Sequence, residues 1–105
     1  GSIVLRDRKH LAEDGRIIVV ATIQSGTGEI LAGPDVVSRG FVYVREAEQL
    51  IEDARCLARD ILIDCADNEI HEWGVIKTRI RDEISRLMYE RTKRNPMILP
   101  VIMEV

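Results

Sequence analysis

The chain has 105 residues and a formal net charge of −3 at pH 7, which is the length of one ordinary domain with one hydrophobic core. Hydrophobic residues make up 46% and charged residues 31% of the chain, so its composition is that of a globular protein and not a disordered one. No apolar run approaches the roughly 20 residues of a membrane span, and no signal peptide pattern begins the chain. We therefore expect a cytoplasmic protein with no membrane partner.

The first half of the chain predicts two strands joined by a tight turn. Residues 16–24 are β-branched and almost wholly apolar, which is typical of a strand at the centre of a sheet. Residues 25–28 contain two glycines, which favours a hairpin turn. A second strand is expected to begin at residues 29–32, to be broken or bent at Gly33-Pro34, and to continue through residues 36–44.

The second half predicts two helices and a last strand. Apolar residues recur at helical spacing over about 46–66 and again over about 71–93. Asp67-Asn68 is expected to end the first helix and to cap the second, which Asn95-Pro96 then ends. Residues 97–105 predict a final aliphatic strand that runs antiparallel to the second strand, while its neighbour in the sheet stays open.

The predicted fold class is α/β, an α+β sandwich with the element order β, β, α, α, β. Two antiparallel helices on one face of a three-stranded sheet would bury both apolar helix stripes. The other face of the sheet would then need to be covered by a second subunit or another domain. The dipeptide Gly1-Ser2 is typical of a tag remnant, which leaves one domain over 3–105.

No residue pattern for catalysis, cofactor binding or metal binding is found. His10 and His71 have no partner at the spacing of metal ligands, and Ser38 is not part of a nucleophile elbow. Cys56 and Cys65 lie nine residues apart in one predicted helix, a rise of about 13.5 Å, which is too long for a disulfide. We expect both cysteines to be reduced and buried.

Two basic clusters remain as possible contacts for RNA phosphates. Arg39 and Arg45 flank the aromatic pair Phe41 and Tyr43, and residues 91–94 read Arg-Thr-Lys-Arg. Each cluster also has a structural explanation, because an arginine can bond loop carbonyls and cations complement the C-terminal end of a helix. With both explanations left open, the candidate RNA contacts are Arg39, Arg45, Lys93 and Arg94.

Three separated stretches, Leu11–Gly15, Gly33–Val44 and Thr92–Val105, together resemble the C-terminal domain of bacterial ribonuclease J. The resemblance extends from Ile3 to the end of the chain. It implies a parent enzyme with a metallo-β-lactamase core and an inserted β-CASP domain. Such enzymes process and degrade RNA as 5′ exonucleases and endonucleases, with zinc bound in the catalytic core.

The family's zinc-binding motif, His-x-His-x-Asp-His, is absent from this sequence. Neither zinc ligands nor catalytic residues can therefore be carried over to this chain, and no cofactor is expected in it. The resemblance implies a non-catalytic domain that supports a homo-oligomer, expected to be a dimer, and positions the catalytic domains. The alternative is a module that binds single-stranded RNA and guides it to the catalytic cleft.

Overall fold

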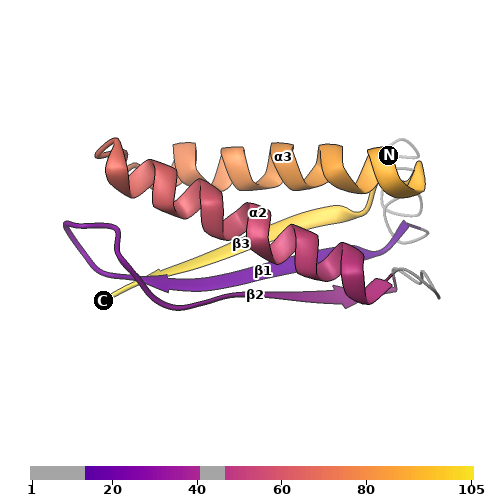
Figure 1. Cartoon of the computed structure of the whole chain (residues 1–105), viewed down its shortest axis with the longest axis horizontal. Helices are drawn as coiled ribbons and strands as arrows, with labels where there is room; N and C mark the ends of the chain where they lie inside the picture. The colour runs from indigo at the N-terminus through magenta and orange to yellow at the C-terminus, as the bar shows by residue number, and fades with distance from the viewer. Residues whose placement is uncertain (1–13, 41–46) are drawn as a thin grey trace, which may run out of the picture.

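A three-stranded sheet carries two helices on one of its faces (Figure 1). The computed structural model describes residues 14–40 and 47–105. The elements follow one another as predicted and are β1 (Arg16–Ile23), β2 (Ile30–Arg39), α2 (Ala47–Asp67), α3 (Trp73–Thr92) and β3 (Met97–Glu104). The predicted fold class is thus confirmed, and within the described residues no helix is long and apolar enough to cross a membrane.

The sheet is mixed, with strand order β2-β1-β3. β1 pairs antiparallel with β2 and parallel with β3, so β3 runs antiparallel to β2, as expected. The structure also answers the question of which strand β3 neighbours. β1 is the central strand, and its side chains on both faces are flanked by those of β2 and β3.

The core lies between the sheet and the two helices. Along β1, side chains alternate between buried residues that face the helices and partly exposed residues that face away. The helices contribute the apolar stripes that their periodicity predicts. Aromatic side chains are absent from the buried cluster of the described residues, in which the members of β1 are Ile17, Val19, Ala21 and Ile23 and those of α3 are Ile76, Ile80, Ile84 and Met88.

Of the two outcomes predicted for Gly33-Pro34, a break or a bend in the strand, the break is not found, because β2 passes through both residues and continues to Arg39. The irregularity appears instead as two register shifts against β1, between Val20 and Thr22 and between Thr22 and Ile23. A proline without an N–H is tolerated here because β2 is an edge strand. The predicted continuation over residues 41–44 lies outside the described residues.

The prediction that Asn68 caps the second helix is wrong. Its side-chain amide donates to the backbone carbonyl of Asp64 at 2.8 Å, and so closes the end of α2 instead. α3 begins after Glu72, which occupies the N-cap position without a side-chain hydrogen bond to the helix. Five residues separate α2 from α3, so Asn68 lies too early in the connection to reach the first turn of α3.

The prediction that both cysteines are buried holds only for Cys65. Cys56 is exposed because it lies two residues from the buried Ala54 and Ala58, which places it roughly 200° around the helix from each of them. Its thiol lies 3.7 Å from the Glu52 carboxylate. Burial raises the pKa of the Cys65 thiol, an effect that the charge of Arg79 opposes.

The two thiols are therefore expected to differ in reactivity. In the native protein, dithionitrobenzoate should modify Cys56 within minutes and leave Cys65 unmodified, because only the thiolate of an accessible cysteine attacks the reagent. Unfolding in urea should release a second equivalent of the coloured product. Two fast equivalents from the folded protein would contradict the burial of Cys65.

Candidate functional site

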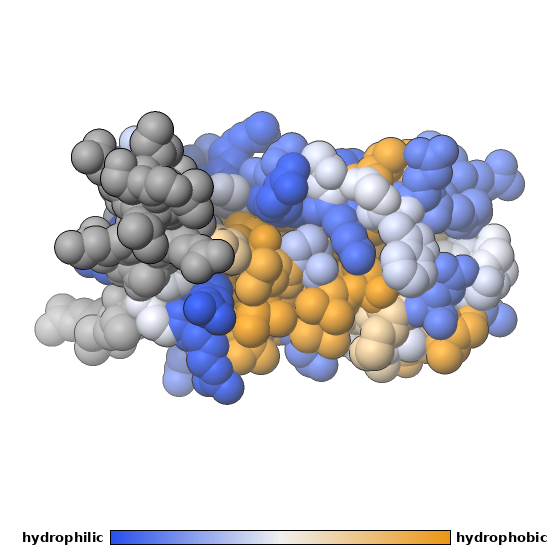
Figure 2. Space-filling model, turned by 180° about the vertical axis from the view of Figure 1, so that it is seen from behind, coloured by the Kyte–Doolittle hydropathy of each residue, from blue (hydrophilic) through white to orange (hydrophobic). Residues whose placement is uncertain are grey.

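The face of the sheet opposite the helices carries an apolar patch, which we call the open face. Its central rows are cross-strand neighbours: Ile18 lies between Val37 and Leu99, and Val20 is next to Val101. Val37, Val101 and Met103 are 37%, 43% and 48% exposed. Figure 2, viewed from the side opposite to that of Figure 1, shows apolar side chains gathered over the sheet and hydrophilic side chains around them. Such a patch on a small domain marks a surface of interaction.

Arg39, one of the candidate RNA contacts, lies at the exposed end of β2. Its cross-strand partner is Arg16, the first residue of β1. Alternation along both strands places the two side chains on the open face, next to Ile18 and Val37. A hollow of about 220 Å³ lies between them and is lined by Gly15, Arg16, Arg39 and Gly40.

The C-terminal end of α3, which Lys93 and Arg94 follow, lies at the same end of the molecule as the start of β1 and the end of β2 (Figure 1). Lys93 ends α3 in a left-handed conformation, and its ammonium lies 5.2 Å from the centre of the Tyr89 ring. The backbone N–H of Asn95 donates to the Asp14 carboxylate at 3.0 Å, which holds the loop after α3 against the start of β1. The candidates Lys93 and Arg94 are thus brought towards Arg39.

Arg45, the remaining candidate, lies outside the described residues, as does His10. The described candidates come from two sequence clusters that the structure brings to one end. Contact between any of them and RNA stays a prediction. Sequence reasoning missed Arg16, which the strand pairing places beside Arg39.

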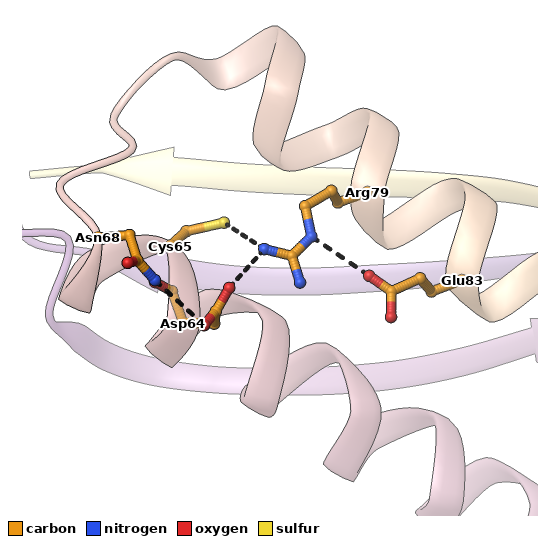
Figure 3. Close-up of polar contacts among 5 residues, drawn as sticks. All are labelled: Asp64, Cys65, Asn68, Arg79 and Glu83. Carbon is orange, nitrogen blue, oxygen red and sulfur yellow. Dashed lines mark hydrogen bonds and ion pairs between the residues drawn. The ribbon is translucent and has the colours of Figure 1, made fainter.

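A polar cluster around Arg79 joins the two helices (Figure 3). The Arg79 guanidinium donates from Nη1 to Asp64 on α2 at 2.7 Å, and from Nε to Glu83 on its own helix at 3.3 Å. Nη1 also lies 3.7 Å from the Cys65 sulfur. The hydrogen bond to Asp64, and less strongly the one to Glu83, raises the pKa of Arg79 above its ordinary value. Arg79 therefore has a structural role, because its side chain links α3 to α2.

His71, Trp73 and Glu104 lie together at the opposite end of the sheet, where the Trp73 indole donates to the Glu104 carboxylate at 2.7 Å. Hydrogen bonds from Ser25 and Trp73 lower the pKa of Glu104. His71 is exposed and is not the cap of α3. Over residues 14–40 and 47–105, no three histidine, cysteine or carboxylate side chains lie close enough to hold a metal ion. The absence of a metal or catalytic site from the whole domain stays a prediction.

Comparison with known proteins gives one consistent family. The family model of the ribonuclease J C-terminal domain matches residues 3–105. The chain is 47% identical to ribonuclease J2 of Bacillus subtilis and 50% identical to ribonuclease J 2 of Staphylococcus epidermidis, over its full length in both alignments. It spans 19% of the length of each of these relatives. The chain therefore belongs to the ribonuclease J C-terminal domain family.

Proposed function

We propose that this chain is a non-catalytic domain of a ribonuclease J, and that its open face pairs with the open face of a second copy. The observation that carries the proposal is the exposed apolar patch on a sheet whose other face is already covered by helices. In this proposal the zinc-dependent cleavage of RNA belongs to the metallo-β-lactamase and β-CASP parts of the longer enzyme. The domain acts in the cytoplasm by holding those parts in a dimer.

The charges around the patch favour a second copy as its partner. A two-fold interface brings the same surface of both subunits together, so it needs complementary groups on one surface. The open face has both signs, because Asp35 lies opposite Val20 on β2 while Arg16 and Arg39 lie at the end of the same face. Antiparallel stacking of two such faces places the arginine pairs of the two copies at opposite ends of the interface, so their like charges do not meet. Burial of apolar area then contributes roughly 25 cal/mol per Å².

Replacement of Val101 by aspartate is expected to abolish the dimer, because a carboxylate at the centre of the interface would be buried without a partner. Light scattering after size exclusion should give a dimer for the wild-type chain at about 100 µM and a monomer for Val101→Asp. The matched control is Val75→Asp on α3, since Val75 is 41% exposed and Val101 is 43% exposed. The control should stay dimeric. A wild-type monomer at this concentration, or dimers of both variants, would overturn the proposal.

A second function, guidance of single-stranded RNA, is favoured by the convergence of basic residues at one end of the domain. Arg16 and Arg39 are cross-strand partners, and the loop containing Arg94 is held against the start of β1. Contacts to phosphates predict an affinity for an oligonucleotide that falls steeply with salt concentration. Fluorescence anisotropy with a labelled oligouridine in low salt tests this function, and a complete lack of binding there would contradict it.

A further inference from the structure

The end of the open face carries two arginines that are cross-strand neighbours. Arg16 and Arg39 are directly opposite in the antiparallel pair of β1 and β2, where facing side chains have Cβ atoms about 5 Å apart. Both residues are exposed. Within the described part of the chain neither guanidinium makes an ion pair.

Like charges directly opposite each other destabilise a sheet. Some other arginines of the described residues lie beside carboxylates: Arg55 beside Glu52, Arg79 beside Asp64, and Arg91 beside Asp53. On β2, the carboxylate that shares the face of Arg39 is that of Asp35, four residues away, which is about 13 Å along an extended strand. Among the described residues, no carboxylate neutralises the positive charge of the pair, which can therefore attract an anionic ligand.

The hollow between the two arginines has the size and the lining of an anion site. It measures about 220 Å³, and the other described residues that line it are Gly15 and Gly40. Both glycines have positive φ angles, 80° and 69°. The Cβ that an alanine would add at position 40 would lie 3.5 Å from the Gly15 Cα, so the two backbones are close together here. Neither glycine places a side chain in the hollow between the two arginines.

We propose that Arg16 and Arg39 together bind one phosphate group of an RNA backbone in this hollow. Guanidinium groups bind phosphate oxygens in bidentate geometry, and two of them around one phosphate neutralise its charge and relieve their own repulsion. The site takes a phosphate of any nucleotide, since contacts to phosphate do not read the base. The proposal rests on the RNA-guidance function and names the residues that perform it.

Arg39→Gln is the variant that tests the site, and Arg86→Gln is its matched control, because Arg86 is an exposed arginine in the middle of α3. At low salt, Arg39→Gln should weaken the binding of a labelled oligouridine by about tenfold and make the slope of log affinity against log salt shallower by about 0.7. Arg86→Gln should change the affinity less than twofold. The melting temperature of Arg39→Gln without ligand should be equal to or above that of the wild-type chain.

The double variant tests whether the two arginines hold the same phosphate. Arg16→Gln alone should match Arg39→Gln, and the double variant should lose clearly less than the product of the two single losses. Losses that multiply would show two independent contacts and overturn the shared site. Equal affinity and salt slope for Arg39→Gln and wild type would overturn the site while leaving RNA guidance through other residues intact.

Inorganic phosphate separates the possible sources of the ligand. If millimolar phosphate raises the melting temperature of the wild-type chain but not of Arg39→Gln, and oligouridine also binds, the proposal is supported. If phosphate stabilises the wild-type chain and oligouridine does not bind, RNA as the ligand is overturned. If neither binds the wild-type chain, the site and the RNA-guidance function both fail.

Discussion

Replacement of Gly33 by alanine is expected to lower the free energy of unfolding by roughly 2–4 kcal/mol. Gly33 has a φ of 81°, and a Cβ built at this position would lie 2.7 Å from the backbone carbonyl oxygen of Val20. The left-handed conformation alone costs an alanine roughly 1–2 kcal/mol. The contact with the central strand adds to this cost, because it involves backbone and not the end of a flexible side chain. Urea unfolding followed by the fluorescence of Trp73, the single tryptophan of the chain, measures the change.

Gly26→Ala is the matched control for this substitution. Gly26 has a φ of 86°, and nothing lies within 4 Å of the Cβ that alanine would add. The control should therefore lose only the conformational part, roughly 1–2 kcal/mol. Equal losses in the two variants would show that the close approach of β2 to Val20 is not tightly constrained.

The irregular pairing around Gly33 also explains why the arginine pair could not be predicted from the sequence. Ile23 pairs with Ile30 next to the turn. A hairpin continued in that register would place Arg16, seven residues before Ile23, opposite Val37, seven residues after Ile30. The two register shifts move β2 by two residues, so that Arg39 lies opposite Arg16 instead. Turn residues and alternation predict a hairpin, but they do not reveal how many residues a bulge inserts.

Local periodicity was sufficient for the helices and strands. The predicted helices, 46–66 and 71–93, are observed as Ala47–Asp67 and Trp73–Thr92. The pairing of β3 with β1 could not be predicted in the same way, because it joins segments about 80 residues apart. The convergence of Arg39 and Arg94 depends on that pairing. The sequence therefore identified individual basic residues, while the topology decides which of them are neighbours.

Replacement of Ile80 by alanine is expected to lower the free energy of unfolding by roughly 2–5 kcal/mol. Ile80 is fully buried in the middle of the stripe that α3 packs against the sheet. Alanine removes apolar contacts and leaves a cavity that the surrounding side chains fill only in part. Ile80→Val should cost about 1 kcal/mol, which makes a graded series measurable by urea unfolding. Val75→Ala, at an exposed position of the same helix, should change stability by less than about 0.5 kcal/mol.

This series, compared with Val101→Asp, also distinguishes the role of the helix-covered face of the sheet from that of the open face. If the helix-covered face stabilises the fold and the open face serves association, Ile80→Ala should lower the stability of the monomer. Val101→Asp should instead abolish the dimer and leave monomer unfolding within about 1 kcal/mol of the wild-type value. Monomer unfolding is measured at protein concentrations below the dissociation constant of the dimer, because subunit association stabilises the native state. A loss for Val101→Asp as large as that for Ile80→Ala would mean that the open face belongs to the core of the single domain, and the apolar patch would no longer argue for a partner.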